Sequence, residues 1–340
     1  MSLFKQSLAK IIDGENLERG EAEALMGAMM EGEVPPSQIA AALTGLRVKG
    51  ETVDELTGLA SAMRDKAARL PQSASHAVDT CGTGGDGGKT FNISTAAAIV
   101  AAAAGVPVAK HGNRAVSSRS GSADVLEALG VPTQLSPEDA VKALDKQGIC
   151  FLFAPLFHQA MKHVMPVRRE LGFRTCFNLL GPLSNPAGVK RQLVGVYDPA
   201  LTEPVAEVLT RLGAERVLVV AGLEGIDEIS VSGETRISES REGRIRTFQL
   251  TPEELGLTRH PLAALAGGDA VVNASIIRGV LRGEPGAPRD VVTANAGAVL
   301  YLAGHAASLQ EGVEAAAAVI DQGGAEAKLA EMKGAFSHVS

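Results

Sequence analysis

Residues 1–72 carry apolar positions at helical spacing and no strand-like alternation. The capping box Thr52-x-x-Glu55 precedes an apolar series that falls on one face of a helix: Leu56, Leu59, Ala60, Met63, Ala67 and Leu70. Another apolar-periodic run begins after Pro35-Pro36 and ends at Gly50. The pattern predicts an all-helical segment of three or four short helices.

From about residue 73 the pattern alternates between short apolar strands and helices. Strands are expected at 76–80, 106–109, 149–153, 192–197 and 216–221, and helices at 94–104, 122–129, from 136, 201–212, 269–281, 290–303 and 306–320. This alternation is typical of an α/β fold with a mainly parallel sheet. We therefore predict a small all-helical N-terminal domain at 1–72 and a larger α/β domain at 73–164 and 189–340, whose central sheet is flanked by helices. The stretch at about 165–188 breaks the alternation and predicts a helical return to the first domain.

Composition narrows the class of protein. With 340 residues, 45% of them hydrophobic, the chain can bury a core, so disorder is excluded. A formal charge of −7 argues against a general nucleic-acid or anionic-membrane partner. The longest apolar stretch, 96–104, is too short to span a bilayer, and the three cysteines match neither a disulfide framework nor a CxxC metal site. We expect a cytoplasmic protein without membrane or nucleic-acid partners.

A glycine-rich segment between a predicted strand and a predicted helix is a candidate phosphate site, since backbone N–H groups at such turns bind anions. The P-loop spacing fails, because its first glycine falls on Thr83. The dinucleotide fingerprint fits Gly82, Gly84 and Gly87 but places Asp86 where a pyrophosphate would approach. A flexible connector is the plain alternative.

The next predicted strand ends in a basic, serine-containing loop that begins at Lys110. In an open parallel sheet ligands bind at the carboxyl ends of the strands, so this loop and the glycine-rich one should lie side by side. An acidic chain that gathers basic residues at such loops is expected to bind a phosphorylated ligand; they are Lys89, Lys110, Arg114 and Arg119.

Five motifs, in one order along the chain, resemble those of the anthranilate phosphoribosyltransferase family. They are Gly82-Thr-Gly-Gly-Asp86, Asn92-Ile-Ser-Thr95, Lys110-His-Gly-Asn-Arg114, Asn178-Leu-Leu-Gly-Pro-Leu183 and Gly222-Leu-Glu-Gly-Ile-Asp-Glu-Ile-Ser230. The resemblance covers essentially the whole chain. It implies transfer of the phosphoribosyl group of 5-phospho-α-D-ribose 1-diphosphate (PRPP) to the amine of anthranilate, with release of pyrophosphate, as the second step of tryptophan biosynthesis. It also implies two Mg²⁺ ions and a homodimer formed through the helical domain.

The resemblance assigns roles residue by residue. PRPP contacts are expected from Gly82, Gly85, Asp86, Thr90, Asn92, Ile93, Ser94, Thr95, Lys110, His111, Gly112, Asn113, Arg114, Ala115, Val116, Ser117, Ser118 and Ser122. Anthranilate contacts are expected from Gly82, Asn113 and Arg168, metal ligands from Ser94, Asp227 and Glu228, and catalytic roles for Lys110, Asp227 and Glu228.

Elementary chemistry agrees with these roles. An acidic doublet is ordinarily a solvated turn, but Asp227-Glu228 follows an apolar strand and supplies the hard oxygen ligands that Mg²⁺ prefers. The guanidinium of Arg168 can bind a carboxylate with two parallel hydrogen bonds. Neither His111 nor His158 is assigned as a general base, because an aromatic amine is already neutral at pH 7 and can attack without one. Cys81 and Gln159 depart from the family pattern without removing a ligand.

Two alternatives remain at this point. A pyrimidine-nucleoside phosphorylase resembles the family in fold but uses a different lysine- and serine-bearing loop, against which Lys110-His-Gly-Asn-Arg114 argues. A non-catalytic relative that binds nucleic acid would be expected to lack Asp227-Glu228 and to carry a basic groove.

Overall fold

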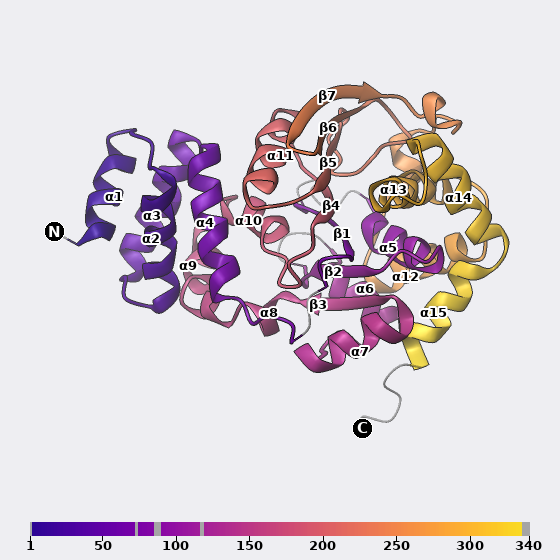
Figure 1. Ribbon diagram of the computed structural model, residues 1–340, viewed down its shortest axis with the longest axis horizontal. Coiled ribbons are helices and arrows are strands. Elements are labelled where there is room, and N and C mark those ends of the chain that lie inside the picture. The colour runs from indigo at the N-terminus through magenta and orange to yellow at the C-terminus, as the bar shows by residue number, and fades with distance from the viewer. Residues whose placement is uncertain (1, 72–73, 85–89, 116–118, 335–340) are drawn as a thin grey trace.

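The computed structural model describes residues 2–71, 74–84, 90–115 and 119–334. Figure 1 shows N-terminal helices at one end and a helix-covered sheet filling the rest. The predicted fold class is confirmed: a helical N-terminal part precedes an α/β part with a mainly parallel sheet. The N-terminal helices are α1 (Leu3–Ile12), α2 (Arg19–Glu31), α3 (Pro36–Lys49) and α4 (Val53–Lys66).

The predicted capping box starts α4. The Thr52 hydroxyl accepts a hydrogen bond from the Glu55 amide at 3.2 Å, and the Glu55 carboxylate accepts one from the Thr52 amide at 2.8 Å. The other Glu55 oxygen accepts the Leu17 amide at 2.9 Å and so also fastens the segment before α2. The same buried carboxylate pairs with Lys49, which satisfies its charge.

The seven strands form one sheet in the order β3-β2-β1-β4-β5-β6-β7. Strands β1 to β5 are parallel, and β6 and β7 are antiparallel. Their bounds are Val78–Gly82, Val108–Gly112, Ile149–Phe153, Arg191–Gly195, Arg216–Gly222, Thr235–Arg241 and Arg244–Leu250. The strand order reverses between β1 and β4, and such a reversal opens a ligand crevice at the carboxyl ends of the strands.

Both faces of the sheet are covered by helices. Leu218 and Val220 belong to one buried cluster with apolar side chains of α5 (Ile93–Ala103), α6 (Ser122–Leu129), α12 (Ala270–Leu281), α13 (Ala287–Ala303), α14 (Leu309–Asp321) and α15 (Gly324–Gly334). Val217 and Val219 face the opposite side, where α11 (Thr202–Arg211) packs, while α7 (Pro137–Gln147) covers the β3 end. Burial on both faces explains the continuous apolar composition of β5.

The stretch that breaks the alternation packs against the N-terminal helices. It contains α9 (Met165–Leu171) and α10 (Phe177–Leu183), which contact α3 and α4 respectively and follow α8 (Ala154–Phe157) and the 3₁₀ turn η1 (Gln159–His163). Val167, Phe177 and Leu180 join the same buried cluster as the N-terminal helices. Within the described ranges, no helix is both long and apolar enough to cross a membrane.

The hairpin formed by β6 and β7 was not predicted from the sequence. It turns through Glu242 and Gly243, both with positive φ, which is the geometry of a two-residue hairpin turn. The strands are rich in charged side chains because β7 is an edge strand, so they lack a long apolar run. Three short 3₁₀ turns, η2 (Pro199–Leu201), η3 (Glu253–Leu255) and η4 (Leu262–Leu265), complete the connections.

Candidate active site

A cavity of about 700 Å³ lies at the carboxyl ends of the parallel strands. It is lined by the loops that follow β1, β2 and β5, by α9 and α10, and by the start of α12. This cavity is lined by every residue that was expected to bind PRPP, metal or anthranilate and that the structure describes, including Lys110, Asp227, Glu228 and Arg168. Gly85, Asp86, Val116, Ser117 and Ser118 lie outside the described residues.

Two glycines allow Asp227 to sit between the ends of β1 and β4. A Cβ atom on Gly195 would lie 1.6 Å from the Asp227 carbonyl oxygen, and one on Gly82 would lie 2.5 Å from Asp227 Oδ2. The Asp227 carboxylate accepts the Gly84 amide at 2.8 Å. The fold thus brings an acidic residue against a glycine loop 143 residues earlier in the chain.

The side chain of Glu228 contacts the first turn of α5. Its Oε1 accepts the Ser94 amide at 3.0 Å, within the first turn of the helix, where N–H groups lack intrahelical partners. Asp227 and Glu228 are 6% and 8% exposed, so both carboxylates are held at the cavity wall rather than in solvent. With the Ser94 hydroxyl they form a hard-oxygen donor set that suits Mg²⁺, which completes its shell with waters and phosphate oxygens. The described residues contain no group of three or more His, Cys, Asp or Glu that could hold a metal without such help.

Lys110 lies beneath the same loop, on β2. The residue is 3% exposed, and its ammonium donates to the Thr80 carbonyl at 2.5 Å and to Ser94 Oγ at 3.3 Å. Burial lowers the pKa of Lys110, while the nearby carboxylate of Asp79 acts in the opposite direction. Asp79 is itself fixed by the His111 amide at 3.1 Å. A buried cation therefore stands behind the acidic pair and the loop.

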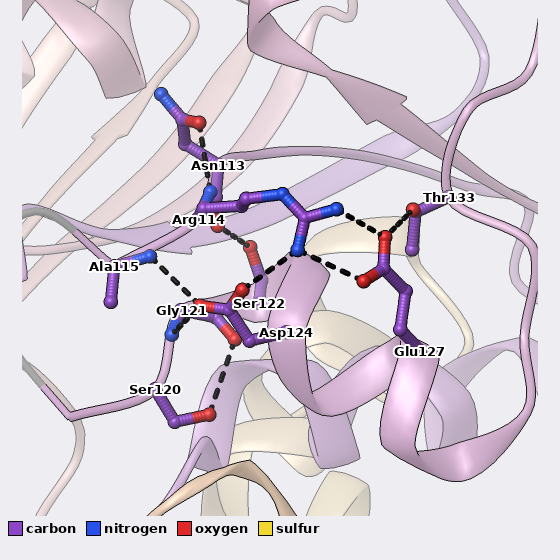
Figure 2. A network of polar contacts seen from close by, with 9 residues as sticks. All are labelled: Asn113, Arg114, Ala115, Ser120, Gly121, Ser122, Asp124, Glu127 and Thr133. Carbon is purple, nitrogen blue, oxygen red and sulfur yellow. Dashed lines mark hydrogen bonds and ion pairs between the residues drawn. The ribbon is translucent and has the colours of Figure 1, made fainter.

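The loop that follows β2 is fastened to α6 by a polar network, drawn in Figure 2. Asp124 accepts the amides of Ala115 and Gly121, both at 2.9 Å. The Arg114 guanidinium donates to Asp124 at 3.0 Å and forms a two-pronged contact with Glu127 at 2.9 and 2.7 Å. The expectation that Arg114 contacts PRPP stays a prediction, because its charge is already paired with α6 here.

Arg168 and His111 line the side of the cavity formed by α9 and α10, and the buried His158 packs against His111. The Arg168 guanidinium lies 5.8 Å from the Phe177 ring centre, and in the described part of the chain no carboxylate pairs with it. His111 Nδ1 lies 3.2 Å from the Gly181 carbonyl, and its ring centre lies 5.1 Å from that of His158. Burial lowers the pKa of His111 to about 3 and that of His158 to about 4, so both rings are neutral at pH 7.

Sequence reasoning missed the contribution of the α12 region. Asn273 and Gly268 line the cavity, and Asn273 is only 2% exposed. A single amide side chain in the otherwise apolar run Ala270-Val-Val-Asn-Ala is the signal that could have identified it, because a buried polar side chain must find hydrogen-bond partners.

Comparisons with known proteins agree with this geometry. Residues 74–326 match the family model "Glycosyl transferase family, a/b domain", and residues 5–67 match "Glycosyl transferase family, helical bundle domain". The chain is 55% identical to the anthranilate phosphoribosyltransferase of Brevibacillus brevis, over 99% of this chain and 100% of that one. The chain belongs to the anthranilate phosphoribosyltransferase family.

Solved structures place this family member among the same enzymes. The crystal structure of anthranilate phosphoribosyltransferase from Thermus thermophilus is 49% identical, with a TM-score of 0.91 and coverage of 97% of this chain and 98% of that one. The Saccharomyces cerevisiae enzyme in complex with PRPP and Mg is 28% identical, with a TM-score of 0.88 and 98% coverage of both chains. The chain is therefore an enzyme, an anthranilate phosphoribosyltransferase by family, and the nucleoside-phosphorylase and nucleic-acid-binding alternatives are set aside.

Proposed function

We propose that this enzyme transfers the 5-phosphoribosyl group of PRPP to the amine of anthranilate, giving N-(5-phosphoribosyl)anthranilate and pyrophosphate, as the second step of tryptophan biosynthesis. The observation that carries the proposal is the position of Asp227 and Glu228, whose carboxylates contact the glycine loop and the start of α5 at the strand-order reversal. The yeast homologue was solved with PRPP and Mg and also with 4-fluoroanthranilate, which supports both substrates.

The reaction breaks the bond between ribose C1 and the pyrophosphate oxygen and forms a bond between C1 and the anthranilate nitrogen. Pyrophosphate leaves with the bonding electron pair, and the amine loses a proton after attack. Asp227, Glu228 and Ser94 would hold two Mg²⁺ ions together with the diphosphate, and the metal supplies positive charge to the leaving group. Lys110 adds a buried positive charge behind the same loop.

No protein base is required for this chemistry. The aromatic amine is already neutral at pH 7, and the neutral His111 and His158 lie against α10, where their surroundings disfavour protonation. Orientation and charge stabilisation would therefore supply the rate. Gly82, at the end of β1, and Asn113, in the loop after β2, line one cavity, which supports the binding of both substrates there.

Arg168 is the candidate ligand for the anthranilate carboxylate. Its partial burial lowers its pKa, and a guanidinium stays charged at neutral pH after such a shift. A planar fork beside the Phe177 ring suits a planar aromatic acid, which can pack against apolar surface while its carboxylate is bound.

We also infer a homodimer formed through the helical domain, which we assign to residues 1–72 with the return at about 165–188. Leu3, Ile12 and Val48 are 70%, 67% and 82% exposed on the neighbouring helices α1 and α3, so apolar side chains of this domain are available to a protein partner. The α/β domain comprises 73–164 and 189–340. The three cysteines are free, buried thiols, which supports a cytoplasmic location.

The test follows anthranilate fluorescence over time with purified protein, PRPP and MgCl₂, and repeats it with EDTA. We expect a PRPP-dependent decay that EDTA abolishes. The double variant Asp227→Asn/Glu228→Gln should keep its fold and lose at least about 100-fold in turnover, because charge on the leaving group is no longer offset. Near-normal turnover of this variant at saturating PRPP and low Mg²⁺ would defeat the assignment. No decay while PRPP still binds would discard anthranilate as the acceptor.

A further inference from the structure

A chain of side-chain amides connects α12 to the candidate PRPP site. Asn273 Nδ2 donates to Asn92 Oδ1 at 2.9 Å, and Asn92 Nδ2 donates to the Ser120 carbonyl at 3.1 Å. Asn273 Oδ1 accepts the Gly268 amide at 2.7 Å. Three segments far apart in sequence, the loops after β1 and β2 and the segment before α12, are thus joined through two asparagines.

The direction of these hydrogen bonds fixes the orientation of both amides. A side-chain amide donates only through nitrogen and accepts only through oxygen. The Gly268 amide holds Asn273 Oδ1, so Asn273 Nδ2 must face Asn92, and Asn92 Oδ1 must face Asn273. Asn92 therefore turns its Nδ2 toward Ser120, and because that nitrogen carries a second hydrogen, Asn92 has a donor left for a ligand in the cavity that it lines.

The segment before α12 also lies directly against the backbone of the loop after β1. Thr90 and Ala266 form an isolated bridge, and the Phe91 amide donates to the Leu265 carbonyl at 3.2 Å. A Cβ atom on Gly267 would lie 2.7 Å from both the Thr90 oxygen and the Phe91 nitrogen. No side chain fits between the segment before α12 and the loop after β1, so a displacement of one segment is transmitted to the other.

We propose that Asn273 is a positioning residue for PRPP binding, which acts by setting the amide orientation of Asn92 and by anchoring Gly268. The inference rests on the proposed function, since Asn92 is an expected PRPP ligand. An anionic diphosphate is bound by N–H donors, and an amide turned the other way would present its oxygen to the phosphate instead. In this assignment Asn273 acts through Asn92 and Gly268 and not on the reacting atoms.

The decisive variant is Asn273→Asp, which keeps the shape of the side chain. Its carboxylate can still accept the Gly268 amide but cannot donate to Asn92 Oδ1, so two oxygens would face each other. We expect the PRPP dissociation constant, measured by calorimetry with MgCl₂, and the KM for PRPP to rise about tenfold. The KM for anthranilate should stay within twofold, and kcat should change less than the KM for PRPP.

Two comparisons separate positioning from general loosening of α12. Ile277→Val alters a buried side chain one turn further along the same helix and should lower the melting temperature without changing PRPP affinity. In an Asn92→Ala background, Asn273→Asp should weaken PRPP binding by less than twofold more, because Asn92 no longer has an amide to orient. If Asn273→Asp fails to fold, Asn273→Ala removes the same donor without adding a charge and should raise the same two constants.

The inference is overturned if Asn273→Asp or Asn273→Ala folds and binds PRPP within twofold of the parent chain. It is also overturned if the effects of Asn92→Ala and Asn273→Asp simply multiply. A parent chain that binds PRPP but does not consume anthranilate defeats the proposed acceptor and leaves this test intact, since calorimetry needs no transfer. A parent chain that does not bind PRPP defeats both.

Discussion

Replacing Gly82 with alanine should damage the acidic pair without straining the backbone. Gly82 ends β1, and its φ is not among the positive values found at other glycines of the chain, so alanine can adopt its conformation. The added methyl carbon, however, would lie 2.5 Å from Asp227 Oδ2 and 3.1 Å from its Cγ. The clash falls on Asp227, a proposed metal ligand, so adding one methyl group tests the placement of this carboxylate.

The size of the effect follows from the geometry. Ordinary contact begins at 3.4 Å, so the Asp227 carboxylate must retreat by about 0.9 Å. Its backbone cannot follow freely, because the Asp227 carbonyl already lies against Gly195 at a distance that no side chain could share. A displacement of about 1 Å in a catalytic group costs about 100-fold in rate, and overpacking costs about 1–3 kcal/mol in the free energy of unfolding.

The assay measures kcat across a range of MgCl₂ concentrations, together with thermal unfolding. Gly27→Ala is the matched control, because a methyl group there meets nothing within 4 Å and should leave kcat unchanged. The reasoning is refuted if Gly82→Ala keeps kcat within threefold of the parent. It is also refuted if the loss persists undiminished in an Asp227→Ala background, since the methyl would then act on the substrates directly.

Two more results are expected. Arg168→Lys should raise the KM for anthranilate at least about tenfold and leave that for PRPP within twofold, because an ammonium cannot reproduce the two parallel hydrogen bonds of a guanidinium; equal changes in both KM values would contradict this. The unfolded chain protonates its histidines below about pH 6.5, whereas folded His111 and His158 are protonated only near pH 3 and pH 4. The free energy of unfolding should therefore fall as the pH drops through this window, by up to about 1.4 kcal/mol per pH unit for each histidine. His158→Asn should make this slope in denaturant melts shallower, and an unchanged slope would show that the ring is protonated when folded.

Local signals predicted the elements that begin and end with strong caps. The helix 122–129 and the strand 149–153 have the predicted bounds, and α6 ends at Gly130 in the left-handed conformation that stops a helix. Strand β1 begins and ends two residues later than predicted, at Val78 and Gly82. Its polar residue Asp79 is buried in the sheet, where its carboxylate accepts the His111 amide, and a local pattern does not contain that distant partner.

The resemblance placed most of the candidate site, but not the contacts that hold it. Arg114 looked free to bind an anion, and only the fold shows that Asp124 and Glu127 on α6 pair with it. Asn92 and Asn273 are separated by 181 residues, so no spacing rule relates them. Ligand residues share short motifs because one ligand touches them all, whereas the residues behind them are related only by packing.

The arrangement at the cavity wall also gives a physical reason for the metal requirement that we propose. Backbone N–H groups of Gly84 and Ser94, which would attract a phosphate, are bonded to the carboxylates of Asp227 and Glu228. Two carboxylates beside a diphosphate repel it, and the buried cation nearby, Lys110, is a single charge whose pKa is lowered by burial. Divalent cations between the carboxylates and the diphosphate would turn this repulsion into attraction. The same site would then reject free pyrophosphate and bind its magnesium complex, so affinity for PRPP should depend on Mg²⁺ more steeply than affinity for anthranilate does.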